Sequence, residues 1–98
     1  MKRYALDGAL LAETPEVEIG DKIYKVDNRT SNVKRLNEIS QDDEIAILEV
    51  AFGQQAAQEI VSLDMPFPAL KELLIVTTAA MTGETVEDVR NRFHSAIV

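Results

Sequence analysis

The chain has 98 residues, 46% of them hydrophobic and 28% charged, which is the composition of a globular domain and not of a disordered chain. It contains no cysteine, so disulfide bonds, thiol nucleophiles and thiolate metal sites are excluded. We therefore expect residues 1–98 to form a single domain in a reducing compartment.

The net charge of −7 arises in the second part of the chain. Residues 1–41 contain seven basic and seven acidic side chains, whereas residues 42–98 contain three basic and ten acidic ones. A protein that binds nucleic acid needs basic surface to displace the counterions of the phosphates. No basic run is longer than a pair such as Lys34 and Arg35, so we expect no nucleic-acid partner.

The sequence predicts neither a targeting segment nor a membrane segment. Residues 1–4 carry the positive charge of a signal peptide, but Asp7 and Gly8 interrupt the hydrophobic run that should follow. No stretch approaches the roughly 20 apolar residues of a membrane-spanning helix. We expect a cytoplasmic protein with no membrane partner.

The first regular element is predicted to be a β-hairpin over residues 15–27. The preceding residues 1–14 fit either a short helix or an extended segment, with hydrophobic positions at Leu6, Ala9, Leu10 and Ala12. In the hairpin, Gly20 and Asp21 form a two-residue turn, and Gly20 fits the first central position of a type II′ turn. This register places four hydrophobic residues on one face: Val17, Ile19, Tyr24 and Val26.

A two-stranded hairpin is not stable alone in water. Either a helix of the same chain or a second subunit must therefore cover its hydrophobic face, so a homo-oligomer stays open as an alternative. The opposite face sets Glu16 across from Lys25, a favourable charge pair.

After residue 27 the hydrophobic period changes from two to about 3.6, which predicts that residues 28–98 are helical. Three helices are expected first, over about 29–40, from 42–44 to Gly53, and over 54–64. Asn28 or Thr30 can cap the first, and the acids Asp42, Asp43 and Glu44 suit the start of the second. Their predicted buried positions are Val33, Leu36 and Ile39, then Ile45, Leu48, Ala51 and Phe52, then Ala57, Ile60, Val61 and Leu63.

Two further helices are expected. Pro68 suits the first position of the fourth helix, and Gly83 ends it. Residues 70–81 leave almost no polar face, so this helix should be central to the core. Residues 73–78 also fit a buried strand, but the length of the segment and its Pro and Gly brackets favour a helix. Thr85 can cap the last helix. The predicted fold is α+β, an N-terminal β-hairpin followed by about five α-helices.

No set of residues predicts a catalytic or metal site. His94 is the sole histidine and falls on the polar face of the last helix. The acidic groups at 42–44 and 84–88 lack the spacing of a calcium loop and suit the first turns of helices. The glycines form no phosphate-binding pattern. We expect no enzyme activity, no catalytic residue, no metal and no cofactor.

The remaining candidate is the hydrophobic stripe of the last helix. It consists of Val86, Val89, Phe93, Ala96 and Ile97. One interpretation is that the stripe packs on the core of the domain itself. The other is that it binds a partner in the helix-in-groove mode, with Val86, Val89, Phe93 and Ile97 as partner-binding residues.

Several segments, taken in order, resemble one known family. They are the strand–Gly–strand hairpin at 17–27, the helix at 28–39, Phe52 and Gly53, the run at 56–60, and the segment 67–93. In this order they resemble the small tail assembly chaperones of siphophages and Gram-positive prophages. The resemblance covers roughly residues 15–97 and implies a protein that binds the tape measure protein and keeps it soluble in the host bacterial cytoplasm during tail assembly.

Two alternatives remain. A small acidic regulatory or inhibitor module would bind a basic protein through the second half of the chain, and its complex would weaken steeply with salt. An enzyme would need a deep pocket with convergent polar groups, and the sequence offers no residues to line one.

Overall fold

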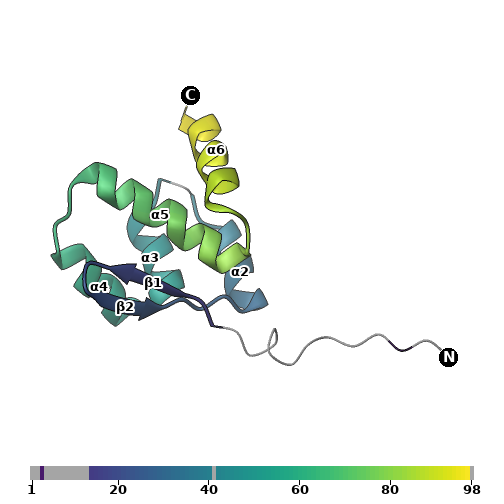
Figure 1. Ribbon diagram of the computed structural model, residues 1–98, viewed down its shortest axis with the longest axis horizontal. Coiled ribbons are helices and arrows are strands. Elements are labelled where there is room, and N and C mark those ends of the chain that lie inside the picture. Colours follow the sequence, from purple (N-terminus) through teal and green to yellow (C-terminus); the bar gives the residue numbers. More distant parts are fainter. Residues whose placement is uncertain (1–2, 4–13, 41, 98) are drawn as a thin grey trace.

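A computed structural model describes residue 3, residues 14–40 and residues 42–97, the last four of these by their backbone alone (Figure 1). The predicted fold is confirmed, because these residues form a two-stranded antiparallel hairpin followed by five helices. In chain order the elements are β1 (Glu16–Ile19), β2 (Lys22–Lys25), α2 (Thr30–Asn37), α3 (Glu44–Phe52), α4 (Gln54–Ser62), α5 (Phe67–Thr82) and α6 (Val86–Ile97). The two interpretations of residues 1–14 lie almost wholly outside the described residues.

The predicted register of the hairpin is confirmed. Val17 pairs with Tyr24, Ile19 with Lys22 and Glu16 with Lys25. Gly20 has a φ of +64°, while Asp21 does not have a positive φ, which matches a type II′ turn and excludes type I′. The face predicted to be hydrophobic points into the core: Val17, Tyr24 and Val26 are buried, and Ile19 is partly buried.

A helix of the same chain covers the hairpin. The ring of Tyr24 meets that of Phe52 edge to face, with the centroids 5.9 Å apart. Its hydroxyl donates a hydrogen bond of 3.1 Å to Oε1 of Glu59 on α4, and Lys22 forms an ion pair with the same carboxylate. The hairpin therefore packs through β1 on α5 and through Tyr24 on the end of α3 and on α4.

Two predicted helix caps are confirmed and one is wrong. The Asp43 carboxylate accepts a hydrogen bond from the Ala46 N–H, and the Thr85 hydroxyl accepts one from the Asp88 N–H. At the start of α2 neither Asn28 nor Thr30 acts as the cap, since the N-cap residue is Arg29 and it makes no side-chain cap bond. Asp27 takes over this role from outside the helix, because its Oδ1 accepts the Arg29 N–H.

The breaks between the later helices also differ in detail from the prediction. Gly53 separates α3 from α4 with φ +91° and ψ 161°, a conformation open to glycine and not the left-handed helical one expected for a helix end. Pro68 stands second in α5, because the helix already begins at Phe67. Gly83 ends α5 as predicted.

The core forms along α5, as the sequence predicts. This helix buries Leu73, Leu74, Ile75, Thr77, Thr78, Ala79 and Met81. Three predicted buried positions are wrong, because Ile45, Val61 and Leu63 are exposed at 56%, 47% and 53%. Helix α3 buries Ile47 and Val50 instead of Ile45. It packs against α2, α4 and α5, so the arrangement of its neighbours decides which of its many hydrophobic residues are covered.

Candidate functional site

The predicted hydrophobic stripe of α6 lies against α5. Val89 is fully buried in a small cluster with Ile75 and Ala79. Val86 and Phe93 are partly buried and pack against this cluster. The side chain of Ile97 lies outside the described residues. The stripe therefore contributes to folding through Val89, and its residues differ in how much of their surface is free for other contacts.

Phe93 occupies a different position from Val89. It packs against both the small cluster and the main core, and it lies beside a cavity of about 310 Å³. The cavity is lined by Leu36, Asn37, Ile39, Ile47, Thr78, Arg92 and Phe93. Figure 1 shows α6 extending from the end of α5 away from the hairpin. The stripe thus borders an open hollow between α6, α5, α2 and α3, lined by both hydrophobic and polar side chains, which we call the Phe93 cavity.

Ion pairs hold α6 from its outer face. Arg92 donates a hydrogen bond of 2.8 Å to Oε2 of Glu84, and this contact, with a hydrogen bond from Thr82, lowers the pKa of Glu84. Arg90 forms an ion pair with Glu72 on α5. These pairs are partly exposed, so they fix the orientation of the helix more than they stabilise it.

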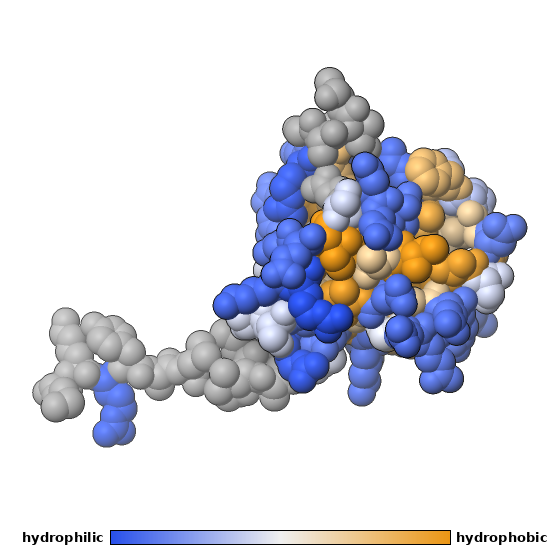
Figure 2. Space-filling view, turned by 180° about the vertical axis from the view of Figure 1, so that it is seen from behind, coloured by the Kyte–Doolittle hydropathy of each residue, from blue (hydrophilic) through white to orange (hydrophobic). Residues whose placement is uncertain are grey.

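A second hydrophobic surface was not predicted from the sequence. A hollow of about 280 Å³ lies between α3, α4 and the start of α5, and we call it the α3–α4 groove. It is lined by Glu44, Ile45, Leu48, Ile60, Val61, Asp64, Met65 and Leu70. In Figure 1, α3 lies behind the hairpin; Figure 2, seen from behind, shows hydrophobic residues gathered in one area among charged ones.

One signal in the sequence points to this groove. Helix α3 contains more large hydrophobic residues than one buried stripe can hold, and Ile45 stays exposed. On α4, Val61 stays exposed beside buried Ile60. An excess of hydrophobic residues in a helix can be recognised from the sequence. Which of these residues remain exposed depends on how the neighbouring helices pack.

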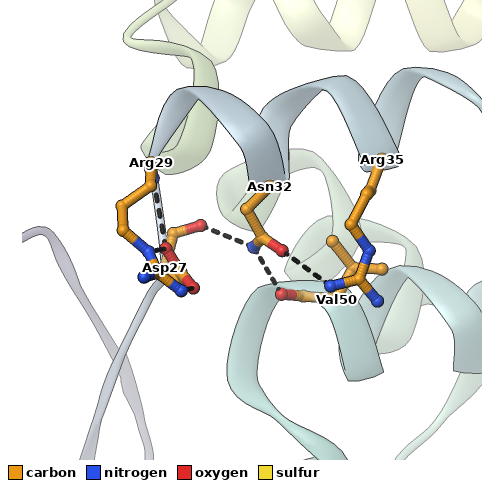
Figure 3. Close-up of polar contacts among 5 residues, drawn as sticks. All are labelled: Asp27, Arg29, Asn32, Arg35 and Val50. Carbon is orange, nitrogen blue, oxygen red and sulfur yellow. Dashed lines mark hydrogen bonds and ion pairs between the residues drawn. The ribbon is translucent and has the colours of Figure 1, made fainter.

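A polar cluster joins the hairpin to α2 and α3 (Figure 3). Arg29 donates two side-chain hydrogen bonds to the Asp27 carboxylate, at 2.9 and 2.7 Å. Buried Asn32 donates to the backbone carbonyls of Asp27, at 2.9 Å, and Val50, at 2.6 Å. Arg29 holds the pKa of Asp27 below its ordinary value of 3.8. A carboxyl that remains ionised throughout the neutral range is a poor general acid or base, so the cluster is structural.

Residues 3, 14–40 and 42–97 contain no group of three or more His, Cys, Asp or Glu side chains able to hold a metal ion. In the same residues no helix combines the length and the hydrophobicity needed to cross a membrane.

Comparisons of the chain with protein-family models, with curated proteins and with solved structures find no match.

Proposed function

We propose that this protein is a non-enzymatic tail assembly chaperone of a phage or prophage, which binds the tape measure protein and keeps it soluble during tail assembly. The observation that carries the proposal is the Phe93 cavity, where a partly buried aromatic side chain borders an open hollow lined by Leu36, Ile39 and Ile47. A hydrophobic side chain of a partner helix that enters this hollow would contact Phe93 on one side and the core on the other.

The arrangement of α6 suits such a role. Its main packing partner is α5, whereas α3 packs against α2, α4 and α5. A helix that packs mainly against one other helix opens at lower free energy than one that packs against several. Movement of α6 would widen the Phe93 cavity, and it would expose Val86, Val89 and Phe93 of the stripe at the cost of the contact between Phe93 and the main core.

The charge of the chain is compatible with a chaperone. A net charge of −7 opposes association between copies of the protein while their hydrophobic surface is exposed. A chaperone that shields long hydrophobic helices needs this combination of hydrophobic contact area and charged surroundings.

The test is co-expression of the candidate tape measure protein with the Phe93→Ser variant. Glu87→Ser is the matched control, since Glu87 is an exposed residue of the same helix. We expect Phe93→Ser to stay folded by circular dichroism while the partner precipitates, and the control to keep the partner soluble. A folded Phe93→Ser variant that still keeps the partner soluble would refute the role of this surface. An unfolded variant would show that the stripe is part of the core only.

A second candidate function is a small acidic regulatory or inhibitor module that binds a basic protein. The observation that favours it is the excess of ten acidic over three basic residues in 42–98. Salt distinguishes the two functions, because a complex held by charge weakens steeply above physiological ionic strength, whereas one held by buried hydrophobic side chains does not.

A further inference from the structure

We infer that the α3–α4 groove is a second binding surface, and that its occupant is an amphipathic protein helix whose hydrophobic stripe is flanked by lysine or arginine. This inference goes beyond the proposed function, which concerns the Phe93 cavity, and it does not depend on the identity of the tape measure protein. It is carried by the uncovered hydrophobic residues of the groove together with its unpaired acidic residues.

The hydrophobic part of the groove has a floor and two walls. Leu48 and Ile60 form the floor, with 0% and 1% of their surfaces exposed. Ile45 on α3 and Val61 on α4 line the same hollow and remain exposed at 56% and 47%. An exposed hydrophobic side chain on each of two neighbouring helices, with a hollow between them, can receive hydrophobic side chains from one face of an amphipathic helix.

The charged part of the groove is acidic. Glu44 and Asp64 line it, and no lysine or arginine of the part of the chain that the structure describes does. Neither carboxylate forms an ion pair within the described residues 3, 14–40 and 42–97, although four other ion pairs form there. A partner with basic residues beside its hydrophobic stripe would complement both carboxylates. An anionic membrane surface would instead be repelled by them.

Asp64 is unfavourable for the stability of the free protein. It has a φ of +49°, and among the described residues it is the one non-glycine residue with a positive φ. It also follows the C-terminal end of α4, where the helix dipole disfavours a negative charge. Glycine or asparagine would suit this backbone conformation better and would carry no charge. The Asp64 carboxylate does not stabilise the free protein, but it would form a favourable charge contact with a basic partner.

The test uses a synthetic amphipathic helix as the probe, with leucine and isoleucine on one face and lysines on both flanks. A second peptide carries glutamate in place of each lysine. Binding is measured by fluorescence anisotropy at low and at physiological ionic strength. We expect the lysine peptide to bind at least tenfold more tightly than the glutamate peptide. Equal binding of the two peptides would overturn the inference.

Two pairs of variants locate the binding. Ile45→Ser should weaken binding of the lysine peptide about tenfold. Its matched control, Ile23→Ser, should not, because Ile23 is equally exposed, at 59%, on the hairpin outside the groove. Asp64→Asn should weaken binding about threefold at low ionic strength while it raises the thermal midpoint of the free protein.

Three further outcomes overturn the inference. The first is peptide binding that Ile45→Ser and Asp64→Asn leave unchanged. The second is binding lost in Phe93→Ser but kept in Ile45→Ser, which would place the peptide at the Phe93 cavity and leave the proposed function intact. The third is binding of vesicles containing phosphatidylserine that Ile45→Ser abolishes, which would make the groove a membrane contact.

Discussion

Asn32→Ala should destabilise the junction of the hairpin with α2 and α3, and it should lower the free energy of unfolding more than the substitution of an exposed residue does. Asn32 is 4% exposed, and its amide group donates to the carbonyls of Asp27 and Val50. Val50 lies in the last turn of α3, where helix carbonyls have no partner within their own helix. The Asn32 side chain on α2 therefore supplies hydrogen-bond donors to a carbonyl at the end of α3 and to one directly after the hairpin (Figure 3).

The expected magnitude follows from these two bonds. Each buried hydrogen bond contributes about 1 kcal/mol net, and a buried carbonyl left without a partner costs about 1–3 kcal/mol. Asn32→Ala should therefore lower the free energy of unfolding by about 2–4 kcal/mol. For a domain of 98 residues this corresponds to a fall in the thermal midpoint of roughly 10–25 °C.

The assay is urea denaturation followed by far-ultraviolet circular dichroism, with Asn37→Ala as the control on the exposed end of the same helix. Asn32→Asp is the sharper variant, because it keeps the shape of the side chain but turns a donor into an acceptor that faces two carbonyls. It should destabilise the protein at neutral pH at least as much as alanine does. If Asn32→Ala stays within about 0.5 kcal/mol of the parent, the cluster does not hold the elements together.

Three further predictions concern single groups and ligands. Thr77 is fully buried, and its hydroxyl has no hydrogen-bond partner among the described residues, so Thr77→Val should raise the free energy of unfolding by about 1 kcal/mol; a lower urea midpoint would contradict this. The pKa of Asp27 is lower in the folded protein than its ordinary value of 3.8, so its contribution to stability is complete above that value and is lost as the pH falls through the folded pKa. Arg29→Gln should reduce this loss, and identical acid denaturation curves for parent and variant would argue against it. Calcium, magnesium, zinc, nucleotides and duplex DNA should each leave the thermal midpoint unmoved, and a rise of several degrees with any of them would overturn the non-enzymatic interpretation.

Local patterns predicted the hairpin and the helix order because each depends on neighbours in sequence. The register follows from Gly20 and from the alternation of Val17 and Ile19 with glutamates, and a shift by one residue would reverse both faces. The central position of α5 follows from its lack of a polar face. In these cases local preference and tertiary structure agree.

The sequence could not predict the parts that depend on distant contacts. Periodicity placed Ile45 and Val61 in the core, but the packing of α3 among three other helices leaves them exposed. The role of Asn32 was missed because its partners, Asp27 and Val50, belong to two other segments of the chain. The sequence predicted one hydrophobic stripe on α6 without distinguishing its residues. In the structure Val89 is buried against α5, whereas Phe93 is only partly buried and lies beside the cavity.

The central claim is that α6 and the Phe93 cavity bind a hydrophobic helix of the tape measure protein. Hydrogen–deuterium exchange of the purified protein, alone and in complex with the co-expressed candidate tape measure protein, tests this claim directly. If a partner helix binds there, the backbone amides of α6 should exchange more slowly in the complex, and so should those of α2 and α3 that surround the cavity. A stable complex in which the exchange of α6, α2 and α3 is unchanged would contradict it.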